Sequence, residues 1–325
     1  MIIQLKPDAD VESAEHDLAG LGLWVRRLDG GGAAQFLVDP ASARVAGERV
    51  LEVEGVARVV GAASAHPRVD AHPSRVDVAG VAIGAGAAPV WMAGPCSVES
   101  EDQIHGLARR LAPLGVTFLR GGAFKTRTSP YSFQGHGERA LSWMRAAADA
   151  TGLRVVTEVL SPQDAEIVAA HADLIQIGSR NMQNSPLLRA AASQGKAILL
   201  KRGLAALVEE WLLAAEYCLV LGAPAVIFCE RGIRSFDPST RNVLDLGTVA
   251  LLSQVYGLPV IVDPSHGAGR RDLLAPLSRA ALAAGAAGLL LETHDDPGSA
   301  YSDGPQALPP DELNALLGSL RPAPR

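Results

Sequence analysis

Four side chains of the types that bind divalent metals lie far apart in the sequence, yet each follows a short apolar run. Cys96 occurs in Ala-Gly-Pro-Cys-Ser, His266 in Asp-Pro-Ser-His-Gly and Glu292 directly after Leu-Leu-Leu, with Asp303 one loop later. One thiolate, one imidazole and two carboxylates suit Mn, Fe, Co or Zn better than Mg or Ca. Taken singly, the cysteine is explained as core and the histidine as a hydrogen-bonding group, so the metal interpretation depends on their convergence.

Six basic side chains occupy similar positions after apolar runs, and glycine flanks several of them. They are Arg120, Lys125, Arg127, Arg180, Lys201 and Arg231. Cations gathered at one site repel one another, and guanidinium forks match carboxylates and phosphates, so the set predicts a polyanionic ligand. The alternative is that these cations pair with acidic residues such as Glu158 and Glu230.

The chain as a whole has the opposite charge. Its 29 Lys and Arg against 35 Asp and Glu give a net charge of −6, which argues against nucleic acid or an anionic membrane as a partner. Hydrophobic residues make up 48% of the chain and no apolar stretch is long enough to span a membrane, so we expect a globular, cytoplasmic protein. Three cysteines without a Cys-x-x-Cys pair exclude a disulfide framework, and Cys218 and Cys229 are interpreted as core.

The elements that must position these residues form a repeating pattern from residue 90 onward. Eight apolar runs alternate with amphipathic segments, which predicts parallel strands covered by helices and closed into a (β/α)8 TIM barrel. The runs are 90–93, 117–119, 155–158, 174–177, 198–200, 226–229, 260–262 and 289–291. Chemistry in such a barrel lies at the carboxyl ends of the strands, and the first and eighth strands are neighbours. The four candidate metal ligands, which follow strands one, seven and eight, are therefore expected at one seam.

Residues 1–65 show a different pattern, with the order βαββαβ of a ferredoxin-like α+β domain. Helices are expected at 11–21 and 41–51, and Gly30-Gly31-Gly32 is expected to form a turn. His66-Pro67 and His72-Pro73 then predict a linker at 66–74, because a residue before proline is disfavoured in a helix. The barrel is assigned to 75–325, beginning with a small hairpin around Gly80.

Several long motifs in fixed order resemble those of one enzyme family. They are Ala93-Gly-Pro-Cys-Ser-Val-Glu99, Leu119-Arg-Gly-Gly-Ala-Phe-Lys125, Arg127-Thr-Ser-Pro-Tyr-Ser-Phe-Gln-Gly135, Gln176-Ile-Gly178, Leu200-Lys-Arg-Gly203, Cys229-Glu-Arg-Gly232 and Val262-Asp-Pro-Ser-His266. The chain thereby resembles 3-deoxy-D-arabino-heptulosonate 7-phosphate (DAHP) synthases of the type I beta group, over about residues 75–318. The resemblance implies a condensation of phosphoenolpyruvate with erythrose 4-phosphate that releases phosphate, the first step of the shikimate pathway.

The resemblance also implies a role for each site residue. Cys96, His266, Glu292 and Asp303 would bind the divalent metal, and Cys96, His266 and Lys125 would be the catalytic residues. Arg120 and Lys125 would meet the phosphoenolpyruvate carboxylate, Arg180, Lys201 and Arg231 its phosphate, and Arg127 and Thr128 the aldose phosphate. One departure stands out, since Thr126 replaces the proline that the family usually has between Lys and Arg.

Three other functions compete with this one. A 3-deoxy-octulosonate 8-phosphate synthase would use a different aldose phosphate, but it has Arg three positions after the Lys, whereas Arg127 follows Lys125 by two. An inactive sugar-phosphate-binding barrel would need no metal ligands. A metal-dependent aldolase that uses pyruvate would need no cations around a leaving phosphate.

The first 65 residues resemble, more weakly, the regulatory domain of some family members. That likeness implies an aromatic amino acid as effector, while a purely structural domain is the alternative, and Arg26 stands where a regulated member has a histidine. We also expect a homo-oligomer, either a dimer or a tetramer.

Overall fold

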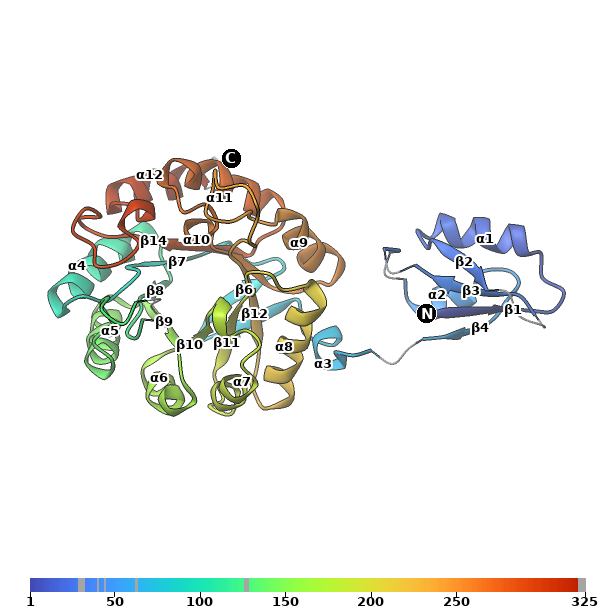
Figure 1. The fold of residues 1–325 in the computed structure, drawn as a ribbon, viewed down its shortest axis with the longest axis horizontal. Coiled ribbons are helices and arrows are strands. Elements are labelled where there is room, and N and C mark those ends of the chain that lie inside the picture. Colours follow the sequence, from blue (N-terminus) through green and yellow to red (C-terminus); the bar gives the residue numbers. More distant parts are fainter. Residues whose placement is uncertain (29–32, 40, 44, 62–63, 126–128, 321–325) are drawn as a thin grey trace. The chain divides into compact units, whose positions relative to one another are not determined.

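The computed structural model describes residues 1–28, 33–39, 41–43, 45–61, 64–125 and 129–320. The chain divides into two compact units, Met1–Ala65 and His66–Arg325 (Figure 1). None of the helices in these described ranges has the length and apolar character needed to cross a membrane.

The first unit is a four-stranded antiparallel sheet with two helices. Its elements are β1 (Ile2–Leu5), α1 (Val11–Gly20), β2 (Val25–Leu28), β3 (Gln35–Val38), α2 (Gly47–Leu51) and β4 (Val56–Val60), and the strand order is β2-β3-β1-β4. Ile3, Leu18 and Phe36 are fully buried in its core. The expected α+β arrangement is confirmed, although α2 begins at Gly47 rather than at residue 41. The expected glycine turn at 30–32 lies outside the described residues.

The segment expected to be a linker is structured and belongs to the second unit. Pro67–Asp70 forms the short helix α3, with Pro67 in its first turn, where a missing N–H costs nothing. The backbone N–H groups of Arg68 and Val69 donate to the Glu216 carboxylate at 3.1 and 2.9 Å. A proline that disfavours helix in the residue before it can therefore also begin a helix, which corrects the linker assigned to 66–74.

The second unit is a closed parallel barrel of eight strands surrounded by helices (Figure 1). A hairpin of β5 (Arg75–Val78) and β6 (Val81–Gly84) precedes it. The barrel strands are β7 (Val90–Gly94), β8 (Phe118–Arg120), β9 (Arg154–Val159), β10 (Leu174–Ile177), β11 (Ala197–Lys201), β12 (Val226–Glu230), β13 (Val260–Val262) and β14 (Gly288–Glu292). The helices are α4 (Glu101–Leu111), α5 (Glu138–Thr151), α6 (Ala165–His171), α7 (Ser185–Ala192), α8 (Val208–Val220), α9 (Leu246–Ala250), α10 (Pro264–Ala268), α11 (Leu274–Ala283) and α12 (Pro310–Leu320).

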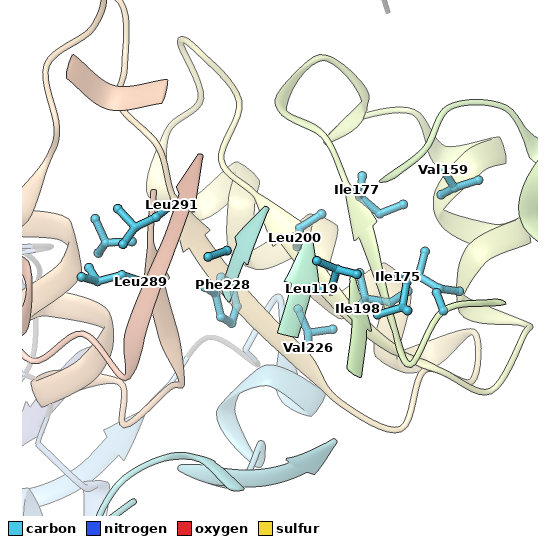
Figure 2. Packing of buried hydrophobic residues seen from close by; sticks show 14 of the residues in the cluster. Leu119, Val159, Ile175, Ile177, Ile198, Leu200, Val226, Phe228, Leu289 and Leu291 are labelled. Atoms are coloured by element: carbon cyan, nitrogen blue, oxygen red, sulfur yellow. The ribbon is translucent and has the colours of Figure 1, made fainter. Parts of the chain in front are cut away.

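Alternation along each strand separates the outer core from the barrel interior. Side chains such as Ile175, Ile198 and Leu289 point outward and pack under the helices in one large apolar cluster (Figure 2). Their neighbours in sequence point inward, because successive residues of a strand face opposite sides.

The barrel interior has two layers of opposite character. Near the amino ends of the strands, Phe118, Leu199, Ile261 and Leu290 pack with Val76, Val78 and Ile83 of the hairpin, which closes that end. At the carboxyl ends of the barrel strands, the inward side chains become polar. They are Arg120, Glu158, Gln176, Lys201, Asp263 and Glu292.

Candidate active site

Four candidate metal ligands converge at the carboxyl ends of β7, β13 and β14. Donor atoms of Cys96, His266, Glu292 and Asp303 all lie within 4.8 Å of one another. Cys96 Sγ lies 3.1 Å from Asp303 Oδ2, and His266 Nε2 lies 3.3 Å from Glu292 Oε1. The seam forms because β14 pairs directly with β7, placing Glu292 opposite Gly94.

Asp263 fixes the orientation of His266. It caps the first turn of α10 by accepting the backbone N–H of His266, and its Oδ2 lies 2.7 Å from His266 Nδ1. Burial lowers the pKa of His266 despite the neighbouring carboxylates, which favours the neutral imidazole that metals bind. Burial would raise the pKa of Asp263, but His266 and Lys201 hold it well below its usual range.

Glu292 is a buried carboxylate surrounded by donors. Arg120 Nη1 donates to its Oε1 at 2.6 Å, and Gln306 Nε2 donates to its Oε2 at 2.5 Å. Burial would raise the pKa of Glu292, but His266, Arg120 and Lys125 outweigh that effect and lower it to about 2. The carboxylate is therefore ionised and oriented.

Cys96 and Lys125 form a second close pair. Lys125 Nζ lies 3.0 Å from both the sulfur and the backbone oxygen of Cys96. Burial, with the nearby charge of Glu292, raises the pKa of the Cys96 thiol to about 12. A bound cation is the group that stabilises a thiolate in such surroundings.

Gly94 permits the close approach of β7 and β8 beneath these ligands. A Cβ atom at this position would collide with the carbonyl oxygen of Arg120, and the glycine has φ of +154°. Only glycine meets both requirements without displacing a strand.

A cavity of about 550 Å³ opens beside the four ligands. His266 and Asp303 line it together with Lys125, Arg180, Lys201 and Arg231. Arg231 is 7% exposed, and its Nη1 is a buried nitrogen with no hydrogen-bond partner among the described residues. A buried guanidinium that lacks an acceptor on one nitrogen is suited to an anionic ligand.

The remaining predicted residues fall into three groups. Arg120 is paired with Glu292, and Lys201 Nζ lies 2.5 Å from Asp263 Oδ2, so two of the predicted cations pair with carboxylates of the site itself. Glu230 instead pairs with Arg202 on the outer side of the barrel, and Glu158 lines the cavity. Thr126, Arg127 and Thr128 lie outside the described residues.

Three residues of the site were missed as functional in the sequence. Arg241 and Asn242 line the cavity, and Gln306 bridges Arg241 and Glu292. Arg241 follows Arg231 by ten residues in the loop after β12, and that shared loop is the signal that could have drawn attention to it.

Comparison with protein families gives one match that spans most of the chain. Residues 64–321 match the model of the DAHP synthetase I family. A phospho-2-dehydro-3-deoxyheptonate aldolase from Thermotoga maritima is 50% identical over 271 residues, which covers 83% of this chain and 80% of the relative. A 2-dehydro-3-deoxyphosphooctonate aldolase from Caulobacter vibrioides is 34% identical over 260 residues, or 74% of this chain and 89% of the relative.

Solved structures show the same relationship. The crystal structure of the DAHP synthase from Thermotoga maritima is similar with a TM-score of 0.77 at 40% identity, covering 98% of this chain and 95% of that one. A truncated form from the same organism is similar with a TM-score of 0.71 at 45% identity, covering 77% and 91% of the two chains.

Proposed function

The chain belongs to the DAHP synthetase I family, and we propose that its site residues act in the roles derived below. The protein is a 3-deoxy-7-phosphoheptulonate synthase. It condenses phosphoenolpyruvate with erythrose 4-phosphate, yielding DAHP and inorganic phosphate, and this is the first step of the shikimate pathway.

Cys96, His266, Glu292 and Asp303 would hold a divalent metal, and they fit one by chemistry and spacing. Their four donors lie within 4.8 Å of one another and combine sulfur, nitrogen and oxygen, a set suited to Mn, Fe, Co or Zn. When bound, such a metal supplies Lewis acidity toward the aldehyde oxygen of erythrose 4-phosphate.

The cations of the cavity would bind and orient phosphoenolpyruvate. Arg180, Lys201 and Arg231 come from the ends of β10, β11 and β12, so a phosphate between them would meet three positive groups. The Nη1 of Arg231, which has no hydrogen-bond partner among the residues that the structure describes, supports this placement. Arg120 and Lys125 would bind the carboxylate, and Arg127 with Thr128 would bind the aldose phosphate.

These cations chiefly offset the electrostatic repulsion between two anionic substrates. Fixed cations screen the repulsion between substrates and hold the reacting carbons in register, which lowers the entropic part of the barrier. As the third carbon of phosphoenolpyruvate attacks the aldehyde, negative charge grows on the aldehyde oxygen. Lys125 Nζ, 3.0 Å from the Cys96 sulfur, would donate a hydrogen bond to that oxygen. Water then adds at the second carbon and loses a proton to solvent, and the tetrahedral centre collapses to the ketone of DAHP as phosphate leaves with its bridging oxygen.

The single observation that carries these assignments is that one cavity, beside the four candidate metal ligands, is lined by His266 and Asp303 and also by the three cations proposed to bind phosphate. The test mixes metal-free protein with both substrates and measures released phosphate before and after Mn²⁺ is added. We expect release only with Mn²⁺ and only with both substrates. Equal release with a five-carbon aldose phosphate, or turnover of pyruvate, would contradict the assignment in favour of the rival reactions.

For the first unit we propose regulation by an aromatic amino acid. A small α+β domain joined to a catalytic barrel can inhibit it only when an effector binds one arrangement of the two better than another. Coupling of about 1–3 kcal/mol would give about 5- to 150-fold inhibition. We expect deletion of residues 1–65 to leave an active barrel that no longer responds to tyrosine or phenylalanine. If the full-length enzyme responds to no aromatic amino acid, the domain serves the predicted dimer or tetramer instead.

A further inference from the structure

We propose that Arg241 is a positioning residue that holds Asp303 in the orientation needed to bind the metal. This inference rests on the metal site proposed above and adds a residue outside the four ligands. Three features of the structure support it: the contacts of Arg241, the anchoring of its loop and the backbone conformation of Asp303.

Arg241 contacts one carboxylate of the metal site directly and reaches the other through Gln306. Its Nη1 lies 3.1 Å from Asp303 Oδ1 and 3.0 Å from Gln306 Oε1, and Gln306 in turn donates to Glu292. Asp303 thus divides its two oxygens, with Oδ1 toward Arg241 and Oδ2 toward Cys96 Sγ at 3.1 Å. One oxygen is fixed by the arginine while the other faces the remaining ligands.

The loop that carries Arg241 is anchored at its base and along its length. Glu230 Oε1 accepts the backbone N–H groups of both Gly232 and Asp245, which closes the loop, and Ile233 pairs with Val243 across it. Asn242 Nδ2 donates to the carbonyl oxygen of His266 at 2.9 Å. Arg241 therefore projects from a frame that is also attached to the histidine ligand.

Asp303 depends on such support because its backbone is in the left-handed region. Its φ is +50° and its ψ is +28°, a conformation that costs free energy for a residue with a Cβ atom. Surrounding contacts must select this conformation, and the ion pair with Arg241 is one of them. Because both side chains are partly exposed, at 41% and 26%, we expect the pair to affect orientation more than global stability.

The test titrates Co²⁺ into metal-free protein without substrate and follows the charge-transfer absorption of the cobalt–thiolate bond. We expect Arg241→Gln to weaken Co²⁺ binding by about 10- to 100-fold, the range typical for partners of metal ligands. Arg241→Lys, which keeps the charge but loses the planar fork, should restore part of that affinity. The thermal unfolding midpoint of each metal-free variant should stay close to that of the original protein.

Arg270→Gln is the matched control. Arg270 is also a surface arginine near α10, and it contacts the same loop at the carbonyl oxygen of Ser239, but its ion pair is with Asp272, and the described contacts of Arg270 include neither Asp303 nor Gln306. Its variant should bind Co²⁺ as the original protein does. Unchanged Co²⁺ affinity in Arg241→Gln would overturn the role of Arg241, as would an equal loss in Arg270→Gln. If the original protein takes up no Co²⁺, the metal site itself is refuted, and the role of Arg241 with it.

Discussion

The two ends of the barrel interior are built from the same strands, yet one is apolar and closed while the other is charged and open. Leu290 and Glu292 illustrate the contrast, since both point inward from β14 and both are at most 1% exposed. Leu290 packs in the closed cluster, and Glu292 pairs with Arg120. Along β14, the buried residue that stabilises the fold and the buried residue that belongs to the active site are therefore only two positions apart.

The difference shows how the charged end is tolerated. Removing an ion from water is costly, and pairing repays only part of that cost, so buried pairs contribute little net stability. Arg120–Glu292 and Lys201–Asp263 therefore draw on the stability supplied by the apolar layer beneath. We expect substitutions in the two layers to have separable effects on metal binding and on folding.

The largest expected effect is the loss of activity when the metal is removed from the charged end of the barrel. Excess chelator should reduce activity to background, and Mn²⁺, Co²⁺ or Fe²⁺ should restore it. Cys96→Ser should lose most metal affinity, because a hydroxyl is a far weaker donor than a thiolate. Cys218→Ala, in α8 outside the barrel interior, is the control and should keep its metal. Full activity in chelator with no metal bound to the protein would contradict the prediction.

A substitution at the apolar end should instead lower the stability of the fold. Leu290→Ala removes a buried side chain two residues before Glu292 and should lower the free energy of unfolding by about 2–5 kcal/mol. Urea denaturation of the metal-free protein measures this change, and Co²⁺ titration measures metal affinity. The comparison between the layers fails if Leu290→Ala loses metal affinity as severely as Cys96→Ser does.

A smaller effect should distinguish the binding of the two substrates. Arg127→Ala should raise the KM for erythrose 4-phosphate by about 10- to 150-fold, since a charge-assisted contact is worth about 1.5–3 kcal/mol. The KM for phosphoenolpyruvate should change far less. Steady-state kinetics with each substrate varied in turn decides this, and equal changes in both constants would refute the assignment of Arg127.

The smallest expected effect is a pH dependence of stability, caused by His72 at the amino end of β12. His72 Nε2 accepts the backbone N–H of Val226, the first residue of β12, and burial lowers the pKa of His72. Below about pH 6.5 the native state therefore binds fewer protons at His72 than the unfolded state does. The stability that neutral His72 contributes is thus fully present above that pH and is lost as pH falls. The urea midpoint should decrease slightly between pH 7.5 and 5.5, and less so in His72→Gln. An identical decrease in both proteins would exclude His72 as the cause.

Periodicity made the barrel predictable from the sequence. Apolar runs such as 174–177 and 260–262 coincide with β10 and β13, because strands buried on both faces leave a continuous apolar signal. The convergence of Cys96, His266, Glu292 and Asp303 was predictable as well, since closure of the barrel makes β14 and β7 neighbours.

Side-chain partners were not predictable in the same way. That Lys201 pairs with Asp263 while Arg202 points outward to Glu230 follows from the alternation of adjacent residues, but the choice of partner depends on rotamers. Arg241 reaches Asp303 across 62 residues through a loop without periodicity. The helix at Pro67–Asp70 depends on a tertiary contact with Glu216, which no local pattern contains.

Gly94 has no functional group, yet a substitution there would disturb the active site. An inherited change to alanine there would add one methyl group, remove no ligand and alter no charge. It would nevertheless force β7 away from the carbonyl oxygen of Arg120, in the strand that leads to Cys96. Natural variants are often ranked by the chemistry of the residue that is lost, and by that measure this one would look harmless. The backbone at this position therefore has no room for a side chain, although the residue there supplies no ligand and no charge.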